Sequence, residues 1–523
     1  MADNHFLEQV LPTCRLILDN ALWTKLSSQF DPATLDALPE LLQQIVNDQT
    51  HLAFLPDLAR LEIAIFQVAQ CKTERTGWAD VEINPCLQLL ALQWKHLCSL
   101  ILDSRASPSP EPEPELILVW PGSKGRVLYR PALNNDILAL KLIVEDISVP
   151  EAAARTGSRQ SRIWPIIHQA VRNRVLLGKE SLIRRNWNMP DALAEKYQTT
   201  DTFTLQWHLT QACDLQCRHC YGREPRKPLD VEKALYVLED FDAFCRQKHV
   251  HGQVSFTGGN PMLHPQLHLI FEEAVNRGFT VGFLANPTSK EQLKSLLQKG
   301  PIAFYQISLE GLEEHNDYIR GQGHFQRSLA FLDTLRELGI YSMVMLTLTK
   351  ANSKQVLDLA QVLEGRADLF TFNRLSMVGS GAYLTPADKM EFTDLLTSYQ
   401  TQAKSVSGMG FKDNLFNLYR LQNDLPLFGG CTGYGCGAAF NFVALLCDGD
   451  IHACRKFPSP LGNIFDHSLE EICDSDLAHA YRQGPAECKD CPIRHVCRGC
   501  MAVIHSSGLD VFTNRDPYCF QKG

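Results

Sequence analysis

The chain has 523 residues, of which 45% are hydrophobic and 21% are charged, with a formal net charge of −9 and a pI near 6.0. These proportions are those of an ordinary globular protein, and the length predicts about three or four domains. The negative balance argues against non-specific nucleic-acid binding as the main role, because such binding relies on a positive surface.

The N-terminus lacks a positive segment followed by an apolar core, and no apolar run reaches the ~18 residues that cross a membrane. We therefore expect a cytoplasmic protein with no membrane partner. Eighteen cysteines in that compartment indicate metal binding more than disulfides. Thirteen of them fall in two regions, 213–220 and 431–519. The other five are expected to fill the core: Cys14, Cys71, Cys86, Cys98 and Cys245.

Residues 1–103 are predicted to form a helical domain. Apolar residues at three- and four-residue spacing indicate amphipathic helices over residues 6–18, 38–46 and 86–102. Nothing in this region suggests chemistry. Its tryptophans are expected in the core: Trp23, Trp78 and Trp94.

Residues 104–115 read SRASPSPEPEPE, which is a marked change in composition. Alternating proline and glutamate favours an extended, solvated chain that cannot form a core. We interpret this stretch as an interdomain linker.

A β-hairpin and three helices are predicted over residues 116–182. Two apolar runs, 116–120 and 126–129, flank a turn-forming stretch rich in glycine, proline and serine. The helices are expected at residues 135–145, 149–156 and 161–177.

This order of elements is a winged-helix arrangement, for which DNA binding by a helix-turn-helix is one interpretation and a structural role is another. Residues 116–177 also resemble the PqqD-like domain, the precursor-peptide recognition element of enzymes that modify ribosomally made peptides. The resemblance implies that a leader peptide binds there as an added strand at the edge of the hairpin sheet.

Residues 200–410 alternate between short apolar runs rich in β-forming residues and amphipathic helical stretches. The expected strands are residues 204–209, 253–257, 279–285, 303–309, 343–349 and 369–375. The expected helices are residues 229–248, 265–277, 290–299, 325–338 and 354–365. Repeated strand-then-helix units imply a parallel sheet with right-handed crossovers, and ligands bind such sheets at the carboxyl ends of the strands.

Three cysteines follow the first of these strands. Cys213, Cys217 and Cys220 lie within eight residues, and no fourth cysteine lies in the same loop. A cubane iron–sulfur cluster normally takes four protein ligands, so one iron would stay open for a ligand that is not protein. A zinc site completed by His208 or His219 is an alternative, as are buried structural cysteines, but the second cysteine pair of a zinc knuckle is missing nearby.

With a strand before it and a helix after it, this loop resembles the signature of radical S-adenosylmethionine (SAM) enzymes. The resemblance implies a partial (β/α)6, TIM-like barrel in which catalysis depends on Cys213, Cys217 and Cys220. It also implies that the amino and carboxylate groups of SAM chelate the open iron.

Motifs at the other strand ends resemble the SAM contacts of this family. By this resemblance the contacts are Tyr221, Gly258, Gly259, Asn260, Asn286, Ser308 and Arg320. Asn260 stands where the family usually has glutamate, and an amide lacks the charge assistance of a carboxylate. Glu310 stands where aspartate is commoner.

The C-terminal region, residues 425–523, contains the second cysteine-rich pattern. Residues 440–447 and 451–454 are expected to pair as a hairpin. The two-residue spacings at 488–491 and 497–500 suit a zinc ribbon and an iron–sulfur site equally. Cys447 and Cys473 are expected to be structural.

The whole set resembles a SPASM domain, which implies two auxiliary [4Fe-4S] clusters. By this resemblance the ligands of one cluster are Cys431, Cys436, Cys454 and Cys500, and those of the other are Cys488, Cys491, Cys497 and Cys519. With four cysteines each, both clusters would be fully ligated, which favours electron transfer over direct substrate coordination.

These resemblances imply a radical SAM/SPASM peptide maturase with three [4Fe-4S] clusters. Such an enzyme reductively cleaves SAM and oxidatively modifies a ribosomally made precursor peptide, here by a thioether or similar crosslink at a Cys-containing site. The leader would bind at residues 116–177, and an external donor of flavodoxin or ferredoxin type would supply electrons. The sequence GGNP at residues 258–261 also resembles that of selenobiotic and geopeptide maturases.

Two other functions stay open. One is a formylglycine oxidase of the sulfatase-maturating type, against which stand the leader-binding module and Arg455, where those enzymes tend to have an acid. The other is a non-catalytic iron–sulfur regulator that binds DNA through the winged helix.

Overall fold

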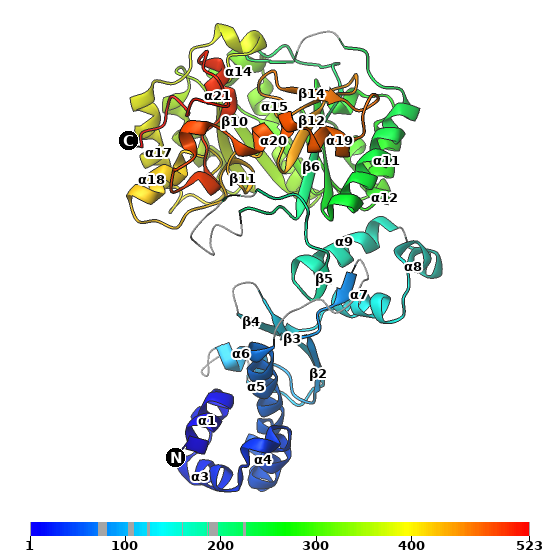
Figure 1. Cartoon of the computed structure of the whole chain (residues 1–523), viewed down its shortest axis with the longest axis vertical. Coiled ribbons are helices and arrows are strands. Elements are labelled where there is room, and N and C mark those ends of the chain that lie inside the picture. Colours follow the sequence, from blue (N-terminus) through cyan, green and yellow to red (C-terminus); the bar gives the residue numbers. More distant parts are fainter. Residues whose placement is uncertain are drawn as a thin grey trace. The chain divides into compact units, whose positions relative to one another are not determined.

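The computed structural model describes residues 2–71, 81–102, 109–122, 126–158, 160–185, 187, 197–222 and 226–521. The chain forms two compact units, Met1–Lys179 and Glu180–Gly523 (Figure 1). Within the described residues, no helix is long and apolar enough to cross a membrane.

The first unit begins with helices. They are α1 (Ala2–Val10), α2 (Pro12–Ile17), α3 (Asn20–Gln29), α4 (Leu38–Val46) and α5 (Leu55–Gln70), with short 3-10 helices η1 (Pro32–Ala37) and η2 (Thr50–Leu52) before and after α4. The helix predicted at residues 38–46 is confirmed. The helix predicted at residues 6–18 is two helices, because Pro12 has no N–H to continue α1 and instead occupies the first turn of α2.

A three-stranded antiparallel sheet follows, with β3 (Glu115–Pro121) between β2 (Gln88–Leu92) and β4 (Val127–Pro131). Side chains on β3 alternate between the two faces of the sheet. Ile117 and Val119 pack with the preceding helices, whereas Leu118 and Trp120 pack in a second core with the helices that follow. Both faces of the central strand β3 are therefore buried.

Two predictions for this region are wrong. Residues 86–102 contain β2 and the short helix α6 (Leu97–Leu102), because residues 88–92 pair with β3 and this pairing overrides their helical spacing. Residues 104–115 do not separate two domains, since β2 lies before them, β3 begins at their end, and the two strands are hydrogen-bonded. Lys95 forms ion pairs with Glu111 and Glu113, which ties the end of this loop to the first unit.

The predicted hairpin is confirmed as β3 and β4, although residues 123–125 of its turn lie outside the described residues. The helices after it are α7 (Asn134–Val144), α8 (Val149–Thr156) and α9 (Gln160–Arg172). The last helix is shorter than predicted, because residues 176–178 form β5 (Leu176–Gly178), which pairs with β1 (Val81–Ile83). The module predicted at residues 116–182 therefore includes strands that precede it in the chain.

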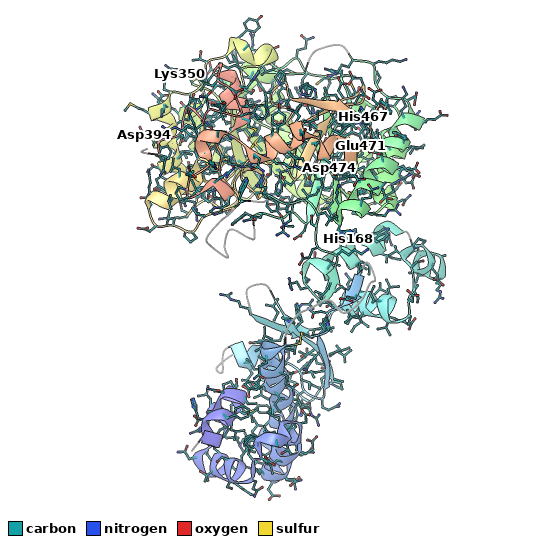
Figure 2. All side chains as sticks on the ribbon, viewed as in Figure 1. His168, Lys350, Asp394, His467, Glu471 and Asp474 are labelled. Carbon is teal, nitrogen blue, oxygen red and sulfur yellow. A yellow bond between two sulfur atoms is a disulfide. The ribbon has the colours of Figure 1, made fainter. Side chains whose placement is uncertain are left out.

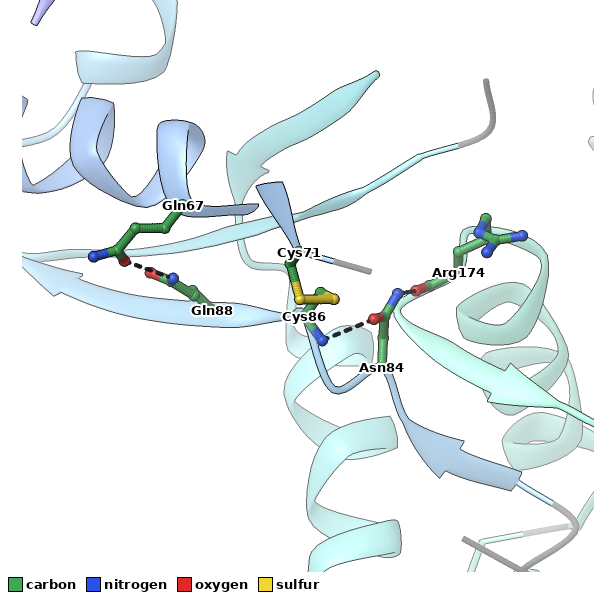
Figure 3. The surroundings of a disulfide bond; sticks show 6 residues. All are labelled: Gln67, Cys71, Asn84, Cys86, Gln88 and Arg174. Carbon is green, nitrogen blue, oxygen red and sulfur yellow. Dashed lines mark hydrogen bonds between the residues drawn. A yellow bond between two sulfur atoms is a disulfide. The ribbon is translucent and has the colours of Figure 1, made fainter. Parts of the chain in front are cut away.

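A disulfide joins Cys71 and Cys86 (Figure 3). The expectation that both cysteines fill the core is wrong for Cys71, which is exposed, whereas Cys86 is buried as predicted. Asn84 fixes the second cysteine, since its Oδ1 accepts from Cys86 N at 3.0 Å and its Nδ2 donates to Arg174 O at 2.8 Å. The disulfide fastens the end of α5 to the segment between β1 and β2. The other three are free and buried, as predicted: Cys14, Cys98 and Cys245.

The second unit contains a nine-stranded sheet of order β11-β10-β9-β8-β7-β6-β12-β13-β14. All six predicted barrel strands are confirmed, and neighbours among them are parallel. They are β6 (Thr202–Thr210), β7 (His251–Gly258), β8 (Thr280–Leu284), β9 (Phe304–Ser308), β10 (Ser342–Leu348) and β11 (Leu369–Arg374).

The predicted barrel helices are also confirmed. They are α11 (Val231–Lys248), α12 (Leu267–Asn276), α13 (Lys290–Lys299), α15 (His324–Glu337) and α16 (Val356–Leu363). The short helix α14 (Glu313–Arg320), between β9 and α15, was not predicted. The strands and helices share one hydrophobic core, in which Trp207, Phe256 and Phe283 are fully buried.

The C-terminal strands extend this sheet instead of forming a separate layer. The predicted hairpin is β12 (Phe442–Leu445) and β13 (Asp450–His452), followed by β14 (Pro460–Asn463). Strand β12 lies parallel to β6, with Phe442 opposite Thr204. The regions predicted as separate domains at 200–410 and 425–523 thus form one unit.

Helices of the C-terminal region complete the second unit. They are α17 (Lys389–Gln402), α18 (Phe416–Gln422), α19 (Leu469–Asp474), α20 (Asp476–Gln483) and α21 (Met501–Ser506). Helix α19, on which Figure 2 labels Glu471 and Asp474, is joined to α11 by ion pairs from Lys248 to Glu470 at 2.8 Å and to Asp474 at 2.7 Å.

Candidate functional site

The loop after β6 contains Cys213, Cys217 and Cys220, at the carboxyl end of a parallel strand. Burial raises the pKa of the Cys217 thiol, Arg320 lowers it, and thiolates at Cys213 and Cys220 raise it further. The three cysteines belong to one short loop, and their role as cluster ligands stays a prediction.

Helix α14 holds this cysteine loop from one side. The backbone N–H of Arg218 donates to Ile319 O at 3.0 Å, and its Nε donates to Tyr318 O at 2.9 Å. The Arg218 guanidinium also lies 4.3 Å from the centre of the Tyr318 ring. These contacts fix the loop between the second and third cysteines.

The glycines after β7 hold the loop from the other side. The backbone N–H groups of Gly259 and Asn260 donate to Thr210 O and Ala212 O, both at 2.7 Å. A Cβ at Gly258, where φ is +126°, would lie 2.3 Å from Thr210 O, and one at Gly259 would lie 2.3 Å from Ala212 O. Glycine is required here because the two loops pack backbone against backbone.

Two buried amides converge on Asp214, which follows the first cysteine. Asn260 Nδ2 donates to Asp214 Oδ1 at 2.9 Å, and Asn286 Nδ2 donates to the same oxygen at 2.6 Å. Asn286 Nδ2 also lies 3.6 Å from Cys213 Sγ. The loops after β7 and β8 therefore both hold the cysteine loop, and Asp214 itself stays exposed.

Glu310 and Arg320 form a buried ion pair beside the cysteines. Arg320 Nε and Nη2 donate to Glu310 Oε1 at 2.9 and 2.6 Å, and Nη1 lies 3.8 Å from Cys217 Sγ. His219 Nε2 is 3.4 Å from both partners. In this structure the guanidinium predicted to bind the carboxylate of SAM is paired with a carboxylate of the protein.

The Glu310 carboxylate is held in its ionised form. Its other oxygen, Oε2, accepts from Thr347 N at 2.8 Å. Burial raises the pKa of Glu310, but His219, Arg320 and the Thr347 amide outweigh burial, so the pKa is lowered. Glu310 therefore provides a negative charge beside Arg320, and Arg320 provides a positive charge beside the Cys217 sulfur.

Ser308 and Tyr221, the remaining predicted contacts, lie at the same edge of the sheet. Ser308 is the last residue of β9 and is half-buried. The ring of Tyr221, directly after Cys220, lies 4.9 Å from the Arg455 guanidinium carbon. Because Arg455 follows Cys454, this contact connects the cysteine loop to the C-terminal cysteines.

The eight predicted C-terminal ligands fall into two neighbouring groups. Burial is the main cause that raises the pKa of Cys431 to about 11 and that of Cys454 to about 12, and nearby Cys436 and Cys500 contribute to both shifts. In the other group, burial raises the pKa of Cys488 to about 12, with Cys491 and Cys519 adding to the shift. Burial likewise raises the pKa of Cys497, to which Cys491 and Cys488 contribute.

We name these groups group I (Cys431, Cys436, Cys454 and Cys500) and group II (Cys488, Cys491, Cys497 and Cys519). These are the two ligand sets that the resemblance to a SPASM domain implies, and cluster binding by them stays a prediction. Cys436 N donates to Cys497 O at 3.1 Å, so the two groups are joined through backbone. Cys447 and Cys473, expected to be structural, are fully buried.

Sequence reasoning missed a buried ion network that supports both groups. Arg374, at the end of β11, donates from Nε to Asp413 Oδ2 at 2.7 Å and from Nη2 to Asp516 Oδ2 at 2.6 Å. Asp516 in turn accepts from Cys500 N at 2.8 Å through Oδ2 and from Cys519 N at 2.8 Å through its carbonyl. The available signal was an arginine near the end of the strand predicted at residues 369–375.

Within the described residues, no three cysteine, histidine or carboxylate groups converge on a single-ion position. The histidines of the zinc alternative lie elsewhere: His208 is buried within β6, and His219 contacts Glu310 and Arg320.

Two family descriptions match this part of the chain. Residues 207–363 match the radical SAM superfamily. Residues 436–501 match the SPASM iron-sulfur cluster-binding domain. These ranges contain Cys213, Cys217 and Cys220 and most of groups I and II.

Curated relatives resemble the chain at low identity. AdoMet-dependent heme synthase from Methanosarcina barkeri is 24% identical over 345 residues, which cover 61% of this chain and 96% of the relative. The antilisterial bacteriocin subtilosin biosynthesis protein AlbA from Bacillus subtilis is 25% identical over 313 residues, which cover 56% of this chain and 66% of AlbA.

Among solved structures, SuiB from Streptococcus suis bound to its precursor peptide SuiA superposes with a TM-score of 0.50 and 18% identity. The superposition covers 78% of this chain and 97% of SuiB, which supports a shared fold. The chain therefore combines a radical SAM domain with a SPASM iron–sulfur cluster-binding domain.

Proposed function

We propose that this protein is a radical SAM maturase that cleaves SAM reductively and oxidises a ribosomally made precursor peptide. The product would contain a thioether or a similar crosslink at a Cys-containing site. The observation that carries the proposal is the juxtaposition of a three-cysteine loop, held at the strand ends by Asn260, Asn286 and Arg320, with two further groups of four cysteines.

Different residues at the strand ends would have different roles in the reaction. A [4Fe-4S] cluster bound by Cys213, Cys217 and Cys220 supplies the electron that SAM cleavage needs. Gly258, Gly259 and Asn260 keep the loop after β7 against the cysteine loop. Ser308 and Tyr221 offer hydroxyl groups at the same edge, and the network of Arg320 and Glu310 keeps a cation at the cysteine sulfurs.

Groups I and II would each hold a fully ligated auxiliary [4Fe-4S] cluster. Each group supplies four thiols, so no iron is left open for a substrate sulfur. This favours a role in accepting the electron released when the peptide is oxidised. An external donor of flavodoxin or ferredoxin type would deliver the electron that starts each turnover.

The peptide would be recognised by the first unit, within residues 116–177. Strand β3 is paired on both sides, by β2 and β4, so an added strand must join an outer edge of this sheet. We place it at β4, which lies within the predicted module and displays Leu128 with 40% exposure. Such pairing would bind the leader through its backbone and leave side-chain pockets to set specificity.

Arg455 does not support the alternative function, that of a formylglycine oxidase. Its guanidinium is directed at the Tyr221 ring, and an arginine is a poor proton acceptor because it stays charged.

The proposed function is tested with the full chain, loaded anaerobically with iron and sulfide. With reductant and SAM we expect 5′-deoxyadenosine, and the Cys217→Ala variant should form none. With a Cys-containing candidate precursor peptide, we expect the peptide to lose two hydrogen atoms per crosslink by mass spectrometry. Iron-loaded protein that forms no 5′-deoxyadenosine with peptide present would refute the proposal.

A further inference from the structure

Two buried arginines lie beside the cysteines of groups I and II. Arg185 belongs to the first residues of the second unit, and Arg498 lies between Cys497 and Cys500. Each side chain is only 1% exposed. Arginine stays charged in proteins, so two full positive charges are buried in this region.

The hydrogen bonds of both arginines go to backbone carbonyls. Arg185 donates to Tyr434 O at 2.7 Å and to Cys436 O at 2.8 Å. Arg498 donates to Arg482 O at 2.7 Å and also to Cys436 O. Nε of each guanidinium has no hydrogen-bond partner within the described residues. Carbonyl dipoles orient these groups but do not neutralise them.

Aromatic rings compensate only part of the positive charge of the two arginines. The Arg185 guanidinium lies 3.6 Å from the centre of the Phe440 ring, and Trp187 lies within 5.2 Å of both arginines. A ring presents a quadrupole and no net charge. Among the described residues, neither arginine forms an ion pair with a carboxylate. A buried charge without a counter-charge is costly, so an anion is expected nearby.

The two arginines contact or adjoin cysteines of both groups. Arg185 and Arg498 each donate to the carbonyl of Cys436 in group I. Arg498 also directly follows Cys497 of group II in the chain. Arg498 therefore faces both groups, whereas Arg185 faces group I.

We propose that Arg185 and Arg498 are the counter-charges of the two auxiliary clusters and raise their reduction potentials. The inference rests on the proposed function, in which groups I and II each bind a [4Fe-4S] cluster. A cubane held by four thiolates is an anion, and reduction adds one electron and one further negative charge. A fixed cation in a low-dielectric region stabilises the reduced form more than the oxidised form, and so favours acceptance of an electron.

The two residues should act differently. Loss of Arg185 is expected to lower the potential of the group I cluster alone. Loss of Arg498 is expected to lower the potentials of both clusters. This difference separates a local charge effect from a general disturbance of the fold.

The experiment uses the full chain with Cys213, Cys217 and Cys220 changed to alanine, so that only groups I and II can bind clusters. Iron and sulfide are measured first, and absence of both clusters in this background would refute the proposed function, not the inference. Midpoint potentials are then measured by anaerobic redox titration with electron paramagnetic resonance. We expect Arg185→Gln to shift one signal to lower potential and Arg498→Gln to shift both.

Matched variants show whether the potentials depend on the charge of the two arginines or on the packing of their side chains. Arg185→Lys and Arg498→Lys keep the charge and should retain potentials closer to the parent. Trp187→Phe keeps both arginines and should leave both potentials unchanged. In one outcome, a glutamine variant loses its iron while the lysine variant at the same position retains both its iron and its midpoint potentials. That outcome would support the inference that the clusters require a positive charge at this position. Unchanged potentials in iron-loaded glutamine variants, or loss of iron in the lysine variants also, would overturn the inference.

Discussion

Asn260 donates a hydrogen bond from Nδ2 to Oδ1 of Asp214 at 2.9 Å, and thereby joins the loop after β7 to the cysteine loop. An ionised glutamate, the residue usual in the family at this position, could only accept hydrogen bonds. The amide at residue 260 and the carboxylate at residue 214 are therefore complementary. In this chain the amide lies on the loop after β7 and the carboxylate lies on the cysteine loop.

Asp214 is expected to contribute to SAM binding. Its carboxylate is exposed at the cysteine loop and oriented by two buried amides, whereas Glu310 is already neutralised by Arg320. A charge-assisted hydrogen bond from the amino group of SAM would contribute about 1.5–3 kcal/mol, so Asp214→Asn should weaken SAM binding about tenfold or more. Calorimetric titration of iron-loaded protein measures the affinity directly.

A charge swap provides the control for this prediction. Asn260→Glu alone places two carboxylates in contact and should also weaken binding. The double variant Asp214→Asn with Asn260→Glu restores one carboxylate and one amide, and should recover most of the affinity. If the double variant binds no better than the two single variants, Asp214 acts through loop packing and not through its charge.

Arg374 is expected to be one of the most sensitive positions for stability in the second unit. It pairs with Asp413 and Asp516, and all three side chains are almost completely buried. Removal of one partner from a buried ion pair costs about 3–5 kcal/mol, because the other charge is left uncompensated. Arg374→Met should therefore lower the midpoint of urea unfolding and, through Asp516, reduce the iron bound by groups I and II.

Arg366 offers a matched control for this variant. It forms an exposed ion pair with Asp333 at 3.5 Å, and such pairs contribute about 0–1 kcal/mol. Arg366→Met should leave both the unfolding midpoint and the iron content close to the parent values. Equal effects of Arg374→Met and Arg366→Met would contradict the prediction that the buried ion pairs contribute more to stability than the exposed one.

His324 is expected to make the second unit acid-sensitive. The pKa of His324 is lowered to about 4, mainly by burial and also by Arg320 and Arg327, while Glu310 and Asp317 oppose the shift. The neutral ring is thus favoured in the folded state. Its contribution to stability is complete above the ordinary histidine pKa of about 6.5 and is lost as the pH falls toward about 4.

The loss is about 2 kcal/mol between pH 7.5 and pH 5, from the size of the pKa difference. Urea unfolding at the two pH values measures it. His324→Asn removes the ionisable ring, so the difference between the two pH values should shrink by this amount. An equal pH dependence in the variant would assign the acid sensitivity to other groups.

The strands and helices of the barrel could be predicted because their signals are local. Each strand from β6 to β11 is an apolar run followed by an amphipathic helix, and the cysteine loop has a fixed spacing. The pairing of β12 with β6 could not be predicted, since Phe442 and Thr204 are far apart in the chain and neither sequence specifies its partner. For the same reason β2 was mistaken for part of a helix.

In the candidate site, too, some residues could be predicted from the sequence and others could not. Cys213, Cys217 and Cys220 form a recognisable motif, but nothing next to Asp214 in the sequence indicates that amides from two other loops will orient it. Arg185 lies far from the cysteines along the chain and reaches Cys436 only in the folded structure. Motifs therefore identified the ligands, while the charges around them required three-dimensional information.

The disulfide between Cys71 and Cys86 is expected to stabilise the first unit. It closes a loop with a sequence separation of 15, for which the chain-entropy model gives about 3 kcal/mol. Cys71→Ser with Cys86→Ser should lower the thermal unfolding temperature of the full chain in non-reducing buffer. In reducing buffer the parent and the variant should unfold at the same temperature, and a difference that persists there would indicate packing and not the covalent bond.

Leu128 is expected to mark the peptide-binding edge of the first unit. Leu128 on β4 and Leu89 on β2 are exposed to a similar extent, 40% and 45%, and lie on opposite outer strands of one sheet. If the leader adds to β4, a charge at residue 128 would lie within the apolar contacts that the peptide makes. Leu128→Asp should therefore weaken binding of a fluorescent leader peptide about tenfold, whereas Leu89→Asp should have little effect.

The two variants control for each other, because each places one charge on an exposed position of an outer strand. Fluorescence anisotropy with full-length, iron-loaded protein gives the affinities, and 5′-deoxyadenosine formed without peptide reports whether the second unit is intact. A loss of affinity confined to Leu89→Asp would move the leader to β2, outside residues 116–177. Unchanged affinity in both variants would exclude strand addition at either outer edge, because a charge introduced beside the added strand must alter its binding.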